Sequence, residues 1–193
     1  MDSDAAPAGI AVLDACVLFR GRLTDLLLRL AAAGLFDPAW SPEIEAEWMR
    51  ALERRRRLAP AVVAARQCLL ARAFPGAACA PDPAQVEALC ARGRSAAQRK
   101  DAHVVATALA AGAAWIVTDN TADFPARLLA PLGLRALRPD AFCLSLAERD
   151  PARAMAAAAA HRAGLPQDAG YPGLLASRRM SLPLFARWLA AQA

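Results

Sequence analysis

The sequence lacks the features that define several common protein classes. Its five cysteines are odd in number and form no C-x-x-C pair, which disfavours a disulfide framework or a structural zinc site. It contains neither G-x-x-x-x-G-K-[ST] nor G-x-G-x-x-G, the glycine-rich patterns that bind nucleotide phosphates. Lys100 is the only lysine. We therefore interpret the cysteines as small apolar side chains of a reduced compartment and find no support for a nucleotide cofactor.

No apolar run is long enough to cross a bilayer. The longest candidates, residues 26–36 and 104–117, are short or are interrupted by arginine or glycine. The first ten residues, MDSDAAPAGI, are acidic and small, and they lack the basic start and the apolar centre of a signal peptide. We therefore expect a cytoplasmic protein with no membrane partner.

The composition that remains is typical of a globular protein, with 57% hydrophobic and 21% charged residues in a chain of 193. This length suits one domain, or one domain with a helical appendage. The net charge of +5 is unevenly distributed, because residues 151–193 contain five arginines and one acidic residue, Asp168. The basic tail fits a polyanionic partner, although a solvated helix surface explains it equally well.

Alternating strand and helix patterns predict an α/β fold with a parallel sheet. Apolar runs predict strands at residues 10–13, 115–118 and 134–137, and a short strand or an extended link at 35–40. Helical patterns lie between them, and only helices are predicted from Pro139 onward. We therefore divide the chain into an α/β domain, residues 1–140, and an all-helical C-terminal extension, residues 141–193.

Polar residues follow two of the predicted strands, at the edge where open parallel sheets have their binding sites. Asp14 follows the first strand, while Asp119, Asn120 and Asp123 follow the strand at 115–118. Because the carboxyl ends of parallel strands meet at one edge of the sheet, we expect these side chains to lie near one another.

Two further acids lie on predicted helices. Asp101 heads an apolar helix face, and the structural alternative is that it only caps this helix. Glu47 lies beside the buried stripe of the helix that begins after Ser41, and the alternative is a salt bridge with Arg50 or Arg54. The sequence leaves both alternatives open.

Several carboxylates at one edge repel one another. At an effective dielectric constant of about 20, two of them roughly 4 Å apart cost on the order of 4 kcal/mol. Such a cluster persists only if a cation neutralises it or some protons are retained. Carboxylates without cysteine or histidine select Mg²⁺ or Mn²⁺, the ions used in nuclease and phosphoryl-transfer chemistry.

Four stretches carry a resemblance to a known family: VLDACVL, SPEIEAEW, KDAHVVATAL and IVTDNTADFP. In this order they are similar to the four acidic motifs of the PIN domain family, metal-dependent single-strand ribonucleases that include the VapC-type toxins of bacterial toxin–antitoxin pairs. The resemblance covers residues 10–137. The chain departs from the family at Asn120, where an acid is usual, and Asp123 is our preferred substitute.

The resemblance implies about five parallel strands between helices, and one or two Mg²⁺ or Mn²⁺ ions. It implies that Asp14 and Asp101 hold the metal, that Glu47 and Asp123 join directly or through water, and that water activated by the metal attacks RNA. Asp119 and Asn120 complete the catalytic set of six. The helical extension is similar to that of one branch of such toxins. The implied partners are RNA, a cognate antitoxin protein and a second copy of the chain.

Two other functions remain open at the level of sequence. A phosphatase of the haloacid dehalogenase type would use Asp14 as nucleophile, but it needs an aspartate where this chain has Cys16. A non-catalytic module would use the acids to bind metal or a basic antitoxin peptide.

Other polar or aromatic features receive structural interpretations. We read residues 53–57, ERRRR, as a solvated face that is alternatively a phosphate-contacting ridge. We read both histidines, His103 and His161, as surface residues and the tryptophans as packing residues.

Overall fold

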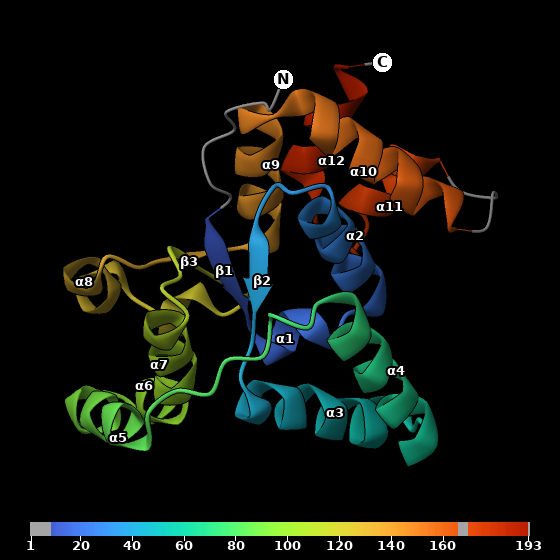
Figure 1. The fold of residues 1–193 in the computed structure, drawn as a ribbon. Coiled ribbons are helices and arrows are strands. Elements are labelled where there is room, and N and C mark those ends of the chain that lie inside the picture. The colour runs from blue at the N-terminus through green and yellow to red at the C-terminus, as the bar shows by residue number, and fades with distance from the viewer. Residues whose placement is uncertain (1–8, 166–169, 193) are drawn as a thin grey trace.

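The structure is a computed structural model that describes residues 9–165 and 170–192. Residues 1–8, on which the signal-peptide interpretation largely rests, and Asp168 lie outside these ranges. A parallel sheet lies at the centre and is flanked by helices, and further helices follow it in the chain (Figure 1). The fold class predicted from the sequence is confirmed.

The strands of the sheet are short, and β1 occupies an inner position. They run in the order β2–β1–β3–β4, with bounds β1 Ile10–Leu13, β2 Asp37–Ala39, β3 Trp115–Val117 and β4 Arg135–Leu137. The side chains of Ala11, Val12 and Leu13 are fully buried, as expected for a strand covered on both faces. The register places Leu13 opposite Val117 of β3. The residues that follow these two strands therefore emerge side by side.

The described part of the chain has four strands where the family resemblance implied about five. Next to β2 there is only a single parallel bridge, between Trp40 and Ala78. Two backbone hydrogen bonds of 2.9 Å join Trp40 to this segment. Pro75 and Pro81 flank it, and proline has no N–H with which to extend a ladder. The fifth strand is thus reduced to one bridge.

Helices make up most of the remaining described chain. They are α1 (Ala15–Leu18), α2 (Gly21–Ala32), α3 (Pro42–Arg56), α4 (Pro60–Ala73), α5 (Pro83–Arg92), α6 (Ala96–Lys100), α7 (Ala102–Ala110), α8 (Ala126–Leu129), α9 (Pro139–Arg149), α10 (Pro151–Ala163), α11 (Tyr171–Ala176), α12 (Pro183–Ala190) and the 3-10 turns η1 (Thr121–Asp123) and η2 (Ala130–Leu132). None of the described helices is long and apolar enough to span a membrane.

The boundaries of two helices follow directly from local sequence. Ser41 caps α3, because its hydroxyl oxygen accepts a hydrogen bond from the Ile44 N–H at 3.3 Å, and Pro42 occupies the first helical position. Gly34 follows α2 with a φ of +75°, in the left-handed region that glycine adopts without strain. The cap agrees with the sequence analysis, which placed the start of this helix after Ser41.

The C-terminal helices pack onto the α/β part. Helix α10 lies against α2, while α9 contacts both α10 and α12. Their buried side chains belong to the same hydrophobic core as those of the sheet. Figure 1 shows α9 to α12 together at the end of the molecule away from α3 and α5. The extension therefore shares its core with the sheet.

The interpretation of His161 as a surface residue is wrong. Its side chain is fully buried between the extension and α2. Nδ1 lies 2.8 Å from the Tyr171 hydroxyl, and Nε2 lies 3.1 Å from the Arg22 carbonyl oxygen. Asp25 lies 3.7 Å from Nε2, although the sequence showed no acidic neighbour. The partners come from distant chain segments, which explains the error.

Candidate active site at the carboxyl edge of the sheet

Asp14 lies at the carboxyl end of β1 and is buried. The Thr118 hydroxyl, at the end of β3, donates a hydrogen bond of 2.6 Å to Asp14 Oδ2. The backbone N–H of Asp14 donates to the Val117 carbonyl oxygen at 3.1 Å. Two neighbouring strands thus fix the backbone and the side chain of this aspartate. Buried carboxylates persist when they are hydrogen-bonded in this way.

Cys16 belongs to the site, although the sequence indicated only a small apolar filler. Its thiol donates to Asp14 Oδ2 at 3.1 Å, and its sulfur accepts a hydrogen bond from the Asp119 N–H at 3.4 Å. Burial, followed by the negative charge of Asp14, raises the pKa of the Cys16 thiol to about 12. The side chain therefore remains a protonated donor that ties together the segments after β1 and β3.

Asp101 occupies the position just before α7, but its side chain forms no capping hydrogen bond. Desolvation by burial raises the pKa of its carboxyl group, and the charges of Asp14 and Asp123 raise it further. The charge of Lys100 partly opposes this rise. The capping alternative is therefore not supported. Asp14 and Asp123 each lie close enough to Asp101 for their charges to repel its carboxylate.

The three polar residues that follow β3 have different surroundings. Asp119 forms an ion pair with Arg20, with Nη1 and Oδ2 2.8 Å apart. The backbone N–H of Asn120 donates to the Thr118 hydroxyl at 3.0 Å. Asp123 ends the turn η1, and its charge acts on Asp101. An arginine already neutralises Asp119, which favours Asp123 as the residue that completes the acidic group.

Arg20 is a residue that the sequence analysis missed. It lies between α1 and α2, and its Nη2 donates to the backbone carbonyl of Arg179 at 3.1 Å. One guanidinium therefore connects the loop that follows β3 with a turn of the C-terminal extension. Within the sequence, the only signal is a single arginine after an apolar run. That signal does not identify either partner.

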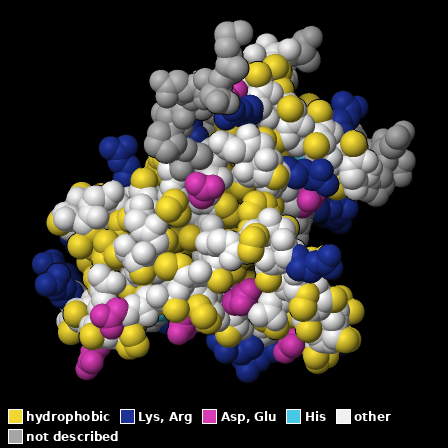
Figure 2. Space-filling view, in the orientation of Figure 1, with side chains coloured by type: hydrophobic (Ala, Val, Ile, Leu, Met, Phe, Trp, Pro, Cys, Tyr) yellow, Lys and Arg dark blue, Asp and Glu magenta, His cyan; other side chains and the backbone are white. Residues whose placement is uncertain are grey.

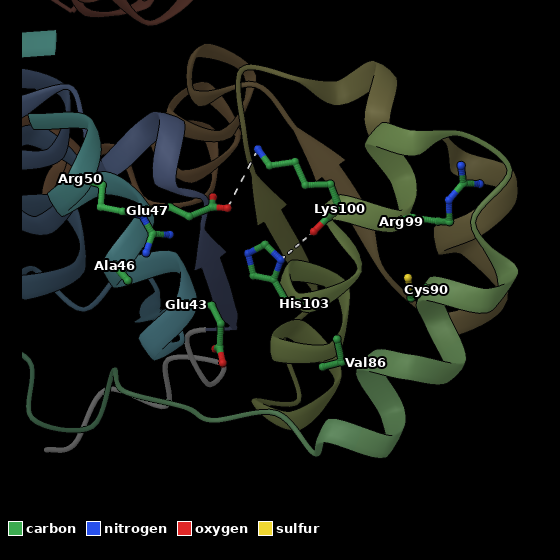
Figure 3. A pocket seen from close by; sticks show the side chains of 9 residues that line it. All are labelled: Glu43, Ala46, Glu47, Arg50, Val86, Cys90, Arg99, Lys100 and His103. Atoms are coloured by element: carbon green, nitrogen blue, oxygen red, sulfur yellow. Dashed lines mark hydrogen bonds and ion pairs between the residues drawn. The ribbon is translucent and has the colours of Figure 1, made fainter. Parts of the chain in front are cut away.

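Glu47 projects from α3 toward the helices on the other side of the acidic edge. Its Oε1 lies 4.0 Å from Lys100 Nζ, so its partner is Lys100 rather than Arg50 or Arg54. Figure 3 shows these two side chains facing each other across a pocket of about 300 Å³ between α3 and the helices α5 to α7. Because Lys100 immediately precedes Asp101, this pocket adjoins the acidic edge.

His103 lines the same pocket, where its side chain is half-buried. Its Nδ1 lies 2.9 Å from the Lys100 carbonyl oxygen. A carbonyl only accepts hydrogen bonds, so Nδ1 must carry the proton and donate. Nε2 is buried and has no hydrogen-bond partner in the described structure. The tryptophan interpretation is correct for Trp40 and Trp48, which are both buried.

The acidic residues match Mg²⁺ or Mn²⁺ in chemical type. Among residues 9–165 and 170–192, no three side chains of His, Cys, Asp or Glu are gathered closely enough to hold one metal ion together. Carboxylate oxygens are nevertheless the donors that these ions prefer. Burial raises the pKa of Asp101 most, and the charges of Asp14 and Asp123 add to this rise by repelling its carboxylate. A bound cation removes this repulsion, so the residues fit a hard divalent ion.

Comparison with known proteins gives one match. A family profile described as PIN domain matches residues 11–122, which is more than half of the chain. The matched range contains Asp14, Glu47, Asp101 and Asp119 and ends one residue before Asp123. Neither the curated proteins nor the solved structures include a match.

Proposed function

The chain belongs to the PIN domain family, and we propose that it is an endoribonuclease that cleaves RNA phosphodiester bonds with Mg²⁺ or Mn²⁺. Members of this family are generally nucleases, which are hydrolases. The observation that carries the proposal is the position of Asp14, which ends β1 at the carboxyl edge of the parallel sheet and is hydrogen-bonded to Thr118 after β3, with Asp101 near enough to feel the charges of Asp14 and Asp123. Such a charge cluster is suited to a divalent ion and a phosphate.

The residues of this edge have separate roles in the proposed mechanism. Asp14, Asp101 and Asp123 would hold the ion, with Glu47 joining directly or through water. When bound, the ion supplies a water of lowered pKa and neutralises charge on the phosphate. Thr118 and Cys16 hold Asp14 in place by hydrogen bonds.

The remaining polar residues arrange the loop that follows β3. Arg20 forms an ion pair with Asp119 that offsets its negative charge. The side chain of Asn120 is available to orient water or a phosphate oxygen, because its position is fixed through its backbone bond to Thr118. The proposed catalytic set remains Asp14, Glu47, Asp101, Asp119, Asn120 and Asp123, with Asp119 acting through the loop.

Cleavage assays with matched variants test this function. The purified chain is incubated with structured RNAs and Mg²⁺, Mn²⁺ or EDTA, beside Asp14→Asn and Asp101→Asn. Asp37→Asn is the control, because Asp37 is an exposed aspartate at the amino end of β2, away from the acidic edge. We expect metal-dependent cuts from the wild type and the control alone. Equal cutting by all four proteins would reveal a contaminating nuclease and refute the proposal.

We propose further that the chain is the toxin of a type II toxin–antitoxin pair in the cytoplasm. Two features support an antitoxin partner: the acidic edge, which suits an arginine of the partner, and an exposed apolar face. On α4, the side chains of Val62 and Leu69 are 55% and 64% exposed. Figure 2 shows apolar side chains gathered in the region of α4. An exposed apolar patch of this kind is typical of an interaction site.

Co-expression with the product of the neighbouring gene tests the antitoxin proposal. We expect a stable complex that suppresses cleavage, and Val62→Ser with Leu69→Ser to weaken it. Failure of the two proteins to co-purify would contradict the proposal. Light scattering of the isolated chain tests the expected homodimer in the same preparation.

A non-catalytic module is the second candidate, favoured by the absence of a preassembled three-ligand metal group in the described residues. In that case Asp14→Asn changes metal or partner binding, and the wild type shows no cleavage under any metal condition. Loss of cleavage with intact partner binding instead supports the enzyme.

A further inference from the structure

We propose that the pocket between α3 and the helices α5 to α7 is a subsite for one nucleotide of the RNA, next to the phosphodiester bond that is cleaved. The inference rests on the proposed function and adds a binding site to it. The pocket is lined by charged residues of both walls, among them Glu47, Arg50, Arg99 and Lys100. Its volume of about 300 Å³ is at the lower end of the range for small-ligand sites.

The position of the pocket makes it continuous with the acidic edge. Glu47 belongs both to the pocket wall and to the proposed catalytic set. Lys100, on the opposite wall, is the residue before Asp101. A nucleotide in the pocket therefore has its phosphate linkage within reach of the acidic residues. A nucleotide bound in a pocket elsewhere on the molecule would not place its phosphate near these acidic residues.

The cations of the pocket are available to a phosphate. Lys100 is held only weakly, because its ammonium group lies 4.0 Å from Glu47 and its side chain is 71% exposed. Exposed ion pairs of this kind contribute little, so a phosphate can replace the carboxylate. Arg99 donates a hydrogen bond to the Gly93 carbonyl at 3.0 Å, and Figure 3 shows its side chain directed away from that of Lys100. Arg50 has no ion pair within the described residues.

The distribution of charge sets the orientation of the ligand. Glu43 and Glu47 both lie on α3, while Arg99 and Lys100 both lie on α6 (Figure 3). The carboxylates of α3 repel a phosphate, although Arg50 on the same helix attracts it, while α6 contributes cations alone. The phosphate therefore belongs on the side of α6. The ribose or base faces α3, where carboxylates accept hydrogen bonds from hydroxyl or amino groups.

His103 supplies a polar contact that the free protein leaves unused. Because Nδ1 donates to the Lys100 carbonyl, Nε2 of the neutral ring is an acceptor. This nitrogen is buried without a partner, which is unfavourable. The matching group is a donor, either a ribose hydroxyl or an N–H of the base.

RNA binding to an uncleaving protein tests the subsite. A fluorescent single-stranded RNA is titrated with the Asp14→Asn protein, alone or combined with Arg99→Ala and Lys100→Ala. Arg162→Ala with Arg187→Ala is the matched control, because these exposed arginines lie on α10 and α12. We expect about tenfold weaker binding for the pocket pair and a salt dependence reduced by roughly one to two phosphate contacts. The control pair should bind within about twofold of the parent, because it leaves the pocket intact.

Substitution of His103 distinguishes the two RNA groups that could donate a hydrogen bond to its Nε2, the ribose hydroxyl and an N–H of the base. His103→Ala and His103→Gln are compared on the RNA and on the same sequence as DNA. Weakening confined to RNA assigns the donor to the ribose 2′-hydroxyl, while equal weakening on both assigns it to the base. Either result supports the subsite.

Two outcomes overturn the inference, and they are distinguishable. If the wild type cleaves RNA and the pocket variants of Asp14→Asn bind as tightly as their parent, the subsite is wrong and the nuclease function stands. If the wild type neither binds nor cleaves RNA, both proposals fail. Circular dichroism of each variant confirms that it is folded.

Discussion

At the scale of single residues, the acidic edge depends on neutral donors as much as on carboxylates. Thr118 and Cys16 both donate to the same oxygen of Asp14, while the second oxygen has no described side-chain donor. One oxygen is therefore fixed and the other remains free for a ligand. This asymmetry leads to a prediction about Thr118.

We predict that Thr118→Val lowers cleavage by one to two orders of magnitude, because Asp14 loses its shortest hydrogen bond. The free energy of unfolding should fall by about 1 kcal/mol, the usual contribution of such a bond. Thr118→Ser keeps the hydroxyl and should retain most activity. Urea unfolding and the cleavage assay provide the two measurements. Full activity in Thr118→Val would show that Asp14 does not need this donor.

A second prediction concerns the charge of Asp101. Its pKa is raised in the folded protein by burial and by Asp14, so folding favours the protonated form. The stability associated with that proton is complete below the unfolded pKa and is lost as the pH rises through the folded pKa. Asp101→Asn removes the charge. We therefore expect a Tm about 2 °C higher than the wild type at pH 7 without divalent ions.

The same comparison at acidic pH is the internal control for Asp101. The difference in Tm should shrink when the carboxyl group of the wild type is protonated. Mg²⁺ should raise the Tm of the wild type more than that of Asp101→Asn, because binding to the folded state alone stabilises it. A lower Tm for Asp101→Asn in metal-free buffer at neutral pH would contradict the prediction.

Sequence reasoning found the acids but not their partners. Asp14, Asp101 and Asp123 could be singled out because each interrupts an apolar pattern at a strand or helix end. Arg20 and Cys16 could not, because their partners Asp119 and Thr118 are 99 and 102 residues away. Long-range pairs of this kind leave no local pattern, so only the fold reveals them.

At the scale of elements, the sequence predicted helices better than sheet edges. Helix α3 carries its own start signal in Ser41 and Pro42, and its start could be read without the fold. The strand at the edge beyond β2 depends on pairing with a distant segment, and Pro75 and Pro81 restrict that pairing to one bridge. Helix α6 was missed as a separate element because it is short and continues almost directly into α7.

The contact between α10 and α2 leads to a prediction about pH. Burial is the largest effect and lowers the pKa of His161. The charge of Asp25 and the hydrogen bond to the Arg22 carbonyl raise this pKa, while the positive charges of Arg29 and Arg22 lower it further. The folded chain therefore favours the neutral ring. The stability from this preference is complete above the unfolded pKa of about 6.5 and is lost as the pH falls through the lowered folded value.

We expect the wild type to lose stability between pH 7.5 and pH 5 partly through His161. His161→Gln keeps hydrogen-bonding capacity but cannot titrate, so its free energy of unfolding should fall less than that of the wild type over this pH range. Denaturant unfolding at the two pH values measures the difference. Parallel pH dependence in both proteins would assign the effect to other groups.

At the scale of the whole molecule, the extension is joined to the acidic edge through Arg20. Its guanidinium binds the carboxylate of Asp119 and the backbone carbonyl of Arg179 at the same time. The shared hydrophobic core adds a second connection. The two parts should therefore unfold together, and calorimetry should detect a single transition.

We predict that Arg20→Ala lowers both Tm and cleavage, because the loop that follows β3 and the turn of the extension lose their common partner. Arg20→Lys should recover only part of the Tm and part of the cleavage activity, because one ammonium group cannot reproduce the planar, forked geometry of the guanidinium. Arg179→Ala is the matched control for Tm, because Arg179 contributes its backbone carbonyl and the bond survives. Equal losses of Tm in Arg20→Ala and Arg179→Ala would refute this arrangement.

The hydrogen bond between Thr118 and Asp14 can form only late in the synthesis of the chain. The two residues are 104 positions apart, and translation adds about 5–20 residues per second. Asp14 is therefore synthesised roughly 5–20 s before its partner. In a nascent chain that stops before β3, β1 has only β2 as a neighbour, and Asp14 has Cys16 as a donor but not Thr118. A newly made chain thus completes its acidic edge only after most of it has been synthesised.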